Sequence, residues 1–241
     1  MSKMRLPNKL FMLPNADKSF HEKWYEGRNK LNFPHPWRGV FLGPPNVGKT
    51  TTIKHIILRA KPQFEEVVVI HCDADYTKEW DDIDCEMLKE IPAPEDWEGR
   101  VKTLVILDDI EYKGMDKTQK RNLDRLFGFV STHKHISVAL TSQDPFNVPP
   151  IVRRCSNLWV LWRCVDLDAM SVVARKTGMK AEGFNSLFNQ LMLEKKDGLW
   201  MDMTDKSPYP MRKNGFNIIN KEPGENTKKE IEKEDIYDCN I

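Results

Sequence analysis

The sequence predicts an α/β protein in which helices flank a mostly parallel central sheet. Short, continuous apolar runs, which are typical of strands buried on both faces, alternate along the chain with amphipathic helical stretches. A glycine-containing phosphate-binding pattern joins the first expected strand to the first expected helix. Polar side chains follow the ends of two later strands. Because the carboxyl ends of parallel strands meet at one edge of a sheet, we expect these groups to share a ligand site there.

The phosphate-binding pattern is Gly43-Pro44-Pro45-Asn46-Val47-Gly48-Lys49-Thr50, which matches G-x-x-x-x-G-K-[ST] at every fixed position. A strand is expected over 37–42 and a helix over 51–60, so the loop has the strand–loop–helix setting that a P-loop NTPase requires. We expect Lys49 to reach the β- and γ-phosphates of ATP and Thr50 to bind Mg²⁺. Because proline has no N–H, the amide donors must come from Asn46 to Thr51.

The later elements follow from apolar runs and helical periodicity. Strands are expected over 67–70, 104–107, 136–140 and 158–162, with an edge strand over 199–203. Helices are expected over 119–130, 166–177 and 184–193. The acidic stretch 73–94 has no such pattern and is expected to be an irregular surface connection.

The domain organisation is expected to be simple, because 241 residues suit one α/β domain with extensions. We expect an N-terminal arm over 1–36, a P-loop ATPase domain over 37–205, and a C-terminal extension with a charged tail over 206–241. The long interval between Lys49 and Asp108 leaves room for a further helix–strand unit. This interval favours the additional-strand type of ATPase, in which a strand lies between the P-loop strand and the strand that ends in Asp108.

Two aspartates follow the apolar strand 104–107, where carboxylates suit phosphoryl transfer to water. Asp108 is the candidate for Mg²⁺, and Asp109 is the candidate general base. The alternative is that the pair is a solvated strand end or a helix cap. Gln143 follows the strand 136–140 and could sense the γ-phosphate, or it could be a surface amide.

Arg153 and Arg154 precede the last central strand and are candidates for a catalytic arginine supplied by a neighbouring subunit. The competing interpretation is that they lie on a helix surface or face DNA.

Composition excludes several classes of protein. The net charge of +1 gives no global basic field, so any DNA contact must be local. The apolar runs are too short to span a membrane, and no apolar signal-peptide stretch follows the N-terminus. The five cysteines form no C-x-x-C pair, which indicates reduced thiols in an intracellular protein.

The motifs typical of GTPases are missing from the sequence. No D-x-x-G follows an apolar strand and no N-K-x-D occurs, so GTP specificity is disfavoured.

Taken together, these motifs resemble the DNA-packaging ATPases of large eukaryotic DNA viruses and virophages, which belong to the wider FtsK–HerA group. The resemblance rests on 43–51, on Ile106-Leu107-Asp108-Asp109-Ile110, and on 140–161 with Thr141-Ser142-Gln143, Val148-Pro149 and Asn157. The double proline of the P-loop departs from the small residues usual in the family.

This resemblance implies an ATP-driven motor that assembles as a homo-oligomeric ring, a pentamer or hexamer, at a capsid vertex protein and pumps double-stranded DNA into a preformed shell. It also implies a location at the virus assembly site of an infected host cell, or in the virion. The family roles fall on Lys49 and Thr50 for phosphate and Mg²⁺, on Asp108 for Mg²⁺, on Asp109 for acid–base chemistry and on Gln143 as sensor.

Two other functions fit the same motifs. One is a cellular or mobile-element DNA-dependent ATPase, such as a transposition helper. The other is an assembly factor that binds nucleotide without hydrolysing it.

Overall fold

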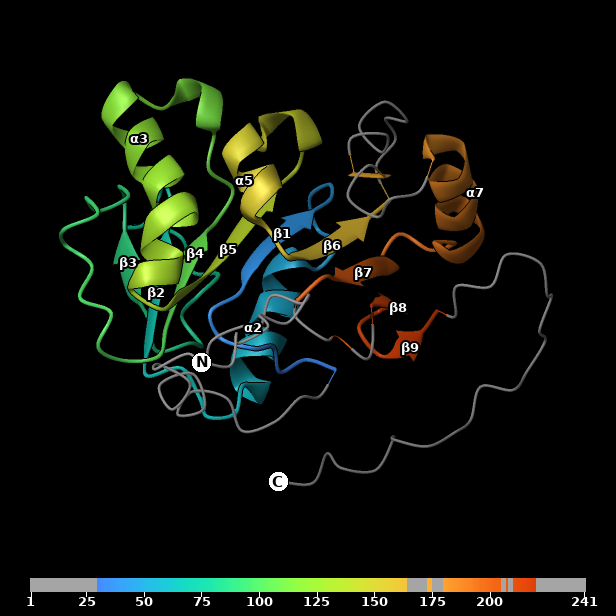
Figure 1. Cartoon of the computed structure of the whole chain (residues 1–241), viewed down its shortest axis with the longest axis horizontal. Coiled ribbons are helices and arrows are strands. Elements are labelled where there is room, and N and C mark those ends of the chain that lie inside the picture. Colours follow the sequence, from blue (N-terminus) through green and yellow to red (C-terminus); the bar gives the residue numbers. More distant parts are fainter. Residues whose placement is uncertain (1–29, 164–172, 175–179, 205–206, 208–209, 220–241) are drawn as a thin grey trace, which may run out of the picture.

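The structure is a computed structural model that describes residues 30–163, 173–174, 180–204, 207 and 210–219. Within these residues a 9-stranded sheet has the order β3-β2-β4-β5-β1-β6-β7-β8-β9 (Figure 1). The strands from β3 to β6 are parallel, and β7, β8 and β9 are antiparallel. The predicted fold class, a mostly parallel sheet flanked by helices, is therefore confirmed.

The bounds of the elements are close to those expected for the central strands. The strands are β1 (Arg38–Leu42), β2 (Glu66–Ile70), β3 (Glu86–Leu88), β4 (Thr103–Leu107), β5 (Ile136–Ser142), β6 (Leu158–Trp162), β7 (Gly198–Asp202), β8 (Met211–Lys213) and β9 (Asn217–Ile218). The helices are α2 (Lys49–Arg59), α3 (Lys117–Arg125), α4 (Ser131–His133), α5 (Pro150–Cys155) and α7 (Ala181–Leu191), with shorter turns η1 (Tyr112–Gly114), η2 (Leu126–Val130) and η3 (Pro145–Asn147).

Successive side chains of the central strands belong to two different core layers, because neighbouring residues of a strand point to opposite faces of the sheet. Val105 and Leu107 of β4 belong to the layer that contains the buried side chains of α3, η2, α5 and α7. Leu104 and Ile106 belong to the opposite layer, which contains Ile53 and Ile56 of α2. Helices on both faces explain why the parallel strands are continuously apolar.

The strand that lies between the P-loop strand and the Asp108 strand is β5. It pairs with β1 on one side and with β4 on the other. The chain between Lys49 and Asp108 instead forms α2, β2 and β3, and both of these strands lie on the far side of β4. The additional-strand architecture is therefore present, and the added strand follows Asp108 in the sequence.

The helix expected over 119–130 is divided. α3 begins at Lys117, where the Asp116 side chain accepts a hydrogen bond of 2.8 Å from the backbone N–H of Gln119, and the α-helical geometry ends at Arg125. A π-helical turn, η2, then continues to Val130 and keeps Phe127 and Val130 in the core. The helix expected over 184–193 is α7, and the one over 166–177 lies almost entirely outside the described residues.

The prediction that 73–94 is an irregular surface connection is wrong in part. It contains β3, which pairs with β2 at the edge of the sheet, and two buried apolar side chains, Trp80 and Ile91. A strand of three residues is too short to produce a recognisable apolar period.

The prediction of an edge strand over 199–203 is also wrong, because β7 pairs with β6 on one side and β8 on the other. The sheet continues past residue 205 to β9. Before residue 37, Phe33 is buried and stacks on Trp200 with ring centroids 6.3 Å apart. No helix in the described part of the chain has the length and apolar character that a membrane crossing needs.

Candidate nucleotide-binding site

The P-loop runs from the end of β1 to the start of α2. Its backbone turns through left-handed conformations at Asn46 (φ 62°) and Gly48 (φ 104°). α2 then begins at Lys49 without a side-chain cap and with no acidic residue in its first turn. Its first N–H groups and the positive end of its dipole therefore suit an anion such as a phosphate.

Gly43 is required by packing at the entry of the loop. An ideal Cβ at this position would lie 2.7 Å from Cβ of Trp162 and 3.1 Å from Cγ2 of Val47. The Lys49 ammonium donates to the carbonyl oxygens of Gly43 at 2.7 Å and Pro44 at 3.1 Å. Gly43, Pro44 and the buried Val47 therefore shape the loop, while other predicted residues line the cleft.

A cleft of about 360 Å³ lies at the carboxyl ends of the parallel strands. It brings together most of the predicted site residues, which come from three segments of the chain. Its lining consists of Pro45, Asn46, Gly48, Lys49, Thr50, Thr51, Lys54, His71, Glu79, Asp108, Asp109, Thr141 and Gln143. The arginines proposed as catalytic, Arg153 and Arg154, lie on α5 and do not line it.

Asp108 lies at the end of β4 and is 5% exposed. Each of its carboxylate oxygens accepts a hydrogen bond of 2.8 Å, Oδ2 from the indole N–H of Trp80 and Oδ1 from the hydroxyl of Thr141. Two such hydrogen bonds from buried donors fix the orientation of the carboxylate. Asp108 is therefore held rigidly at the floor of the cleft, where a fixed carboxylate can orient a cation.

Asp109 is exposed in the cleft and has a left-handed backbone with φ 50°. Its N–H donates to the Thr141 hydroxyl at 2.7 Å, and its Oδ2 accepts from the side-chain amide of Gln143 at 2.6 Å. Thr141 therefore connects both aspartates, while Gln143 connects Asp109 to the end of β5. The predicted proximity of Asp109 and Gln143 is present in the structure.

Four residues that line the cleft are not among the site residues expected from the sequence: Lys54, His71, Glu79 and Thr141. Lys54 could have been inferred, because it follows Thr50 by about one helical turn and faces the same way. Glu79 and His71 lie beyond the end of β2 in a stretch without periodicity, so no sequence pattern marks them. Thr141 belongs to the apolar strand β5 and is fully buried, which hides its polar role.

A second cavity of about 230 Å³ lies against a different face of α2. Its lining includes the aromatic side chains of Trp162, Trp200 and Phe216 and the basic side chains of His55, Arg59 and Lys196. Desolvation by burial and the nearby Arg59 guanidinium lower the pKa of His55 below its ordinary value. The cavity thus combines flat apolar surface with positive charge, next to the P-loop that packs on Trp162.

Oxygen atoms suited to Mg²⁺ are present in the cleft, from the Thr50 hydroxyl and the carboxylates of Asp108 and Glu79. Among the described residues, however, no group of three or more His, Cys, Asp or Glu side chains is placed to hold a metal. These residues therefore fit a Mg²⁺ ion that completes its shell with nucleotide phosphates and water.

A protein-family model, ATPase family associated with various cellular activities (AAA), matches residues 40–161. The chain belongs to this AAA family. The match extends from β1 through the P-loop and Asp108 to β6, so it covers every element that positions the cleft. No curated protein matches the sequence.

Several solved structures share the fold. B204, the DNA-packaging ATPase from Sulfolobus turreted icosahedral virus, has a TM-score of 0.56 and 14% identity, over 74% of this chain and 97% of that chain. B204 from Sulfolobus turreted icosahedral virus 2, a genome packaging NTPase in complex with AMPPCP, has a TM-score of 0.52 and 15% identity, over 77% of this chain and 98% of that one.

The cytoplasmic domain of the Thermomonospora curvata type VII secretion ATPase EccC has a TM-score of 0.52 and 10% identity, over 84% of this chain and 30% of that chain. At these identities the similarity concerns the fold. The expected resemblance to viral packaging ATPases is therefore confirmed as a likeness of fold.

Proposed function

We propose that this AAA ATPase hydrolyses ATP to move double-stranded DNA into a preformed viral capsid. The observation that carries the proposal is the convergence of the P-loop, Asp108, Asp109 and Gln143 on one cleft, with β5 between β1 and β4. The B204 packaging ATPases support it, because this chain covers nearly the whole of theirs with the same fold.

Within the cleft, each group has a distinct task. The start of α2 and the Lys49 ammonium bind the phosphates, and the hydroxyl of Thr50 and the carboxylate of Asp108 hold the accompanying Mg²⁺. That ion neutralises phosphate charge when it is bound. Asp109 accepts a proton from the attacking water, and Gln143 orients Asp109 through their hydrogen bond. In this proposal a change at the γ-phosphate is passed through Asp109 and Gln143 to the end of β5.

The second cavity is the proposed site for the base of the nucleotide. The cleft with Asp108 and Gln143 lies on the β4 and β5 side of β1, whereas this cavity lies on the β6 and β7 side. We propose that a nucleotide spans β1, with its γ-phosphate in the cleft and its base in this cavity, on the side away from β4. Phe216, which is 49% exposed, offers a surface on which a purine stacks.

Motor action requires partners beyond one subunit. We propose a homo-oligomeric ring in which Arg153 or Arg154 of a neighbouring subunit reaches the cleft, since neither lines it within one chain. The net charge of +1 favours DNA contact by basic patches that add up around the ring. The proposed partners are double-stranded DNA and a capsid vertex protein, and the proposed location is the assembly site of an infected cell or the virion.

The test is the ATP hydrolysis rate of wild type, Lys49→Ala and Lys195→Ala, with and without double-stranded DNA, at protein concentrations that favour ring assembly. Lys195 is exposed and lines neither cavity, so its variant controls for loss of one charge. We expect DNA-stimulated turnover that falls at least about 100-fold in Lys49→Ala and persists in Lys195→Ala.

Other results would point elsewhere. Turnover that is indifferent to DNA would contradict the motor and leave a different P-loop ATPase. Nucleotide binding without turnover in assembled protein would favour an assembly factor that does not hydrolyse ATP.

A further inference from the structure

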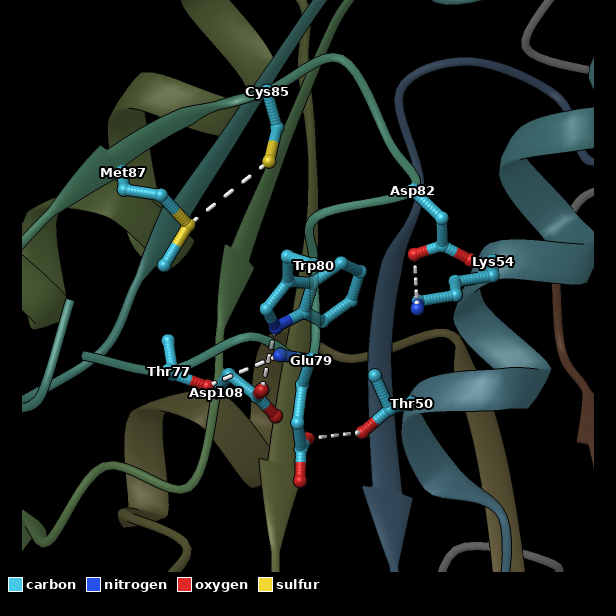
Figure 2. Close-up of polar contacts among 9 residues, drawn as sticks. All are labelled: Thr50, Lys54, Thr77, Glu79, Trp80, Asp82, Cys85, Met87 and Asp108. Carbon is cyan, nitrogen blue, oxygen red and sulfur yellow. Dashed lines mark hydrogen bonds and ion pairs between the residues drawn. The ribbon is translucent and has the colours of Figure 1, made fainter. Parts of the chain in front are cut away.

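The segment of residues 71–85, which leaves the end of β2 and leads toward β3, crosses beside the cleft and is fastened on two sides (Figure 2). Trp80, 2% exposed, donates its indole N–H to Asp108 at 2.8 Å. Asp82 forms an ion pair with Lys54 of α2, and this hydrogen bond lowers the pKa of Asp82. The segment is therefore tied both to the strand β4 and to the P-loop helix.

Glu79 directly precedes Trp80, the first of these two attachments. Its Oε2 accepts a hydrogen bond of 3.2 Å from the hydroxyl of Thr50, and Figure 2 shows the two side chains pointing toward one another. Its backbone N–H donates to Oγ1 of Thr77 at 3.4 Å. Glu79 is exposed, so this contact contributes little to stability. What distinguishes the residue is its position in the cleft, beside the hydroxyl that the P-loop pattern assigns to Mg²⁺.

The arrangement differs from what the motifs alone indicate, since Asp108 was the carboxylate expected to work with Thr50. Both oxygens of Asp108 already accept hydrogen bonds, from Trp80 and Thr141. Thr50 instead donates to Glu79. When a hydroxyl donates its proton to a carboxylate, its oxygen lone pairs are turned away from that carboxylate and are available to a cation.

We propose that Glu79 is a positioning residue of the Mg²⁺ site, where it orients the Thr50 hydroxyl and adds a second carboxylate to the surroundings of the ion. Mg²⁺ in phosphate sites is held by one or two carboxylates, several waters and the substrate phosphates, and Asp108 and Glu79 supply that number. The 71–85 segment then links the cation to both β4 and α2. This inference rests on the proposed binding of Mg²⁺-nucleotide.

The test measures binding, so it is independent of turnover. The affinity of the full chain for a fluorescent, slowly hydrolysed ATP analogue is determined in EDTA and across a Mg²⁺ titration. The variants are Glu79→Gln, which retains the size and removes the charge, and Asp81→Asn. Asp81 is an exposed residue of the same segment that does not line the cleft, so it controls for the lost charge.

For Glu79→Gln we expect the Mg²⁺ concentration at half-maximal tightening to rise about tenfold, because outer-shell partners of metal ligands have effects of about 10- to 100-fold. Affinity in EDTA should stay within about twofold of wild type, since Lys49 and α2 are untouched. Asp81→Asn should match wild type in both conditions.

A Mg²⁺ requirement in Glu79→Gln equal to that of Asp81→Asn would overturn the inference while leaving the proposed function intact. Failure of wild type to bind the analogue would overturn the proposed function itself, and this inference with it. Thermal unfolding checks that the variants are folded. Glu79→Asp retains the charge on a shorter side chain and provides a second test. We expect its Mg²⁺ concentration at half-maximal tightening to lie between those of wild type and Glu79→Gln. A value equal to that of wild type would count against the inference.

Discussion

Thr141 offers a sharp test of how the site is held together. Its side chain is fully buried, and its hydroxyl makes two hydrogen bonds, donating to Oδ1 of Asp108 at 2.8 Å and accepting from the N–H of Asp109 at 2.7 Å. Thr141→Val retains the shape and removes both bonds. It leaves a buried carboxylate oxygen and a partly buried N–H without this partner.

The magnitude follows from those two contacts. A hydrogen bond to a charged group contributes about 1.5–3 kcal/mol, and an unsatisfied backbone N–H costs about 1–3 kcal/mol, so we expect a destabilisation of about 3 kcal/mol. For a domain of this size that loss lowers Tm by about 6–12 °C. ATP turnover should fall at least about tenfold, because Asp109 loses the contact that holds its left-handed backbone.

The assay is urea denaturation followed by fluorescence, together with ATP turnover and analogue binding. Thr141→Ser is the matched control, since it retains the hydroxyl and loses a methyl group, at a cost of about 1 kcal/mol. Analogue affinity should change little in either variant, because the P-loop is not altered. If Thr141→Val proves as stable and as active as Thr141→Ser, the hydroxyl does not organise the two aspartates and the reasoning is refuted.

Two further predictions concern other parts of the chain. Although desolvation by burial raises the pKa of Asp197, hydrogen bonds from Lys213, the Glu194 backbone and Asn214 outweigh it and hold the pKa well below its ordinary value of 3.8. Because the folded pKa is depressed, Asp197→Asn should lower the free energy of unfolding by about 2–3 kcal/mol at neutral pH. The difference from wild type should shrink as the pH falls below 3.8. A difference in denaturation that does not depend on pH would count against this network. Phe216→Ala should weaken ATP binding about tenfold, measured by calorimetry, because stacking of a base on an aromatic side chain contributes about 1–3 kcal/mol to the binding free energy. The affinity for inorganic triphosphate, which has no base, should stay unchanged. Equal losses for both ligands would contradict the proposed base site.

Local signals were enough for the P-loop and for the strand that ends in Asp108. The pattern from Gly43 to Thr50 specifies a turn through its glycines and a helix through the residues that follow, and neighbouring residues alone encode both. The apolar run before Asp108 predicts a buried parallel strand, and parallel strands deliver their ends to one edge. Asp109 and Gln143 could be placed together for the same reason.

Strands too short to show a hydrophobic period could not be predicted from the sequence. β3 has three residues and β9 has two, and each forms because a neighbouring strand offers unpaired backbone groups. The same holds for the extension of the sheet beyond β7, which changed a predicted edge strand into an interior one. Pairing of this kind depends on which strand lies alongside, and the local sequence does not record that.

By itself the sequence determined the fold class, the phosphate-binding loop and the carboxylates at the ends of the strands, because periodicity, glycine turns and parallel-strand geometry act over short stretches of chain. Tertiary structure alone decided the partners of those groups. Trp80 reaches Asp108 from 28 positions away, Glu79 reaches Thr50 from 29, and Thr141 reaches Asp108 from 33. Such contacts exist because packed strands and a fastened loop bring distant residues together, and no local pattern selects them.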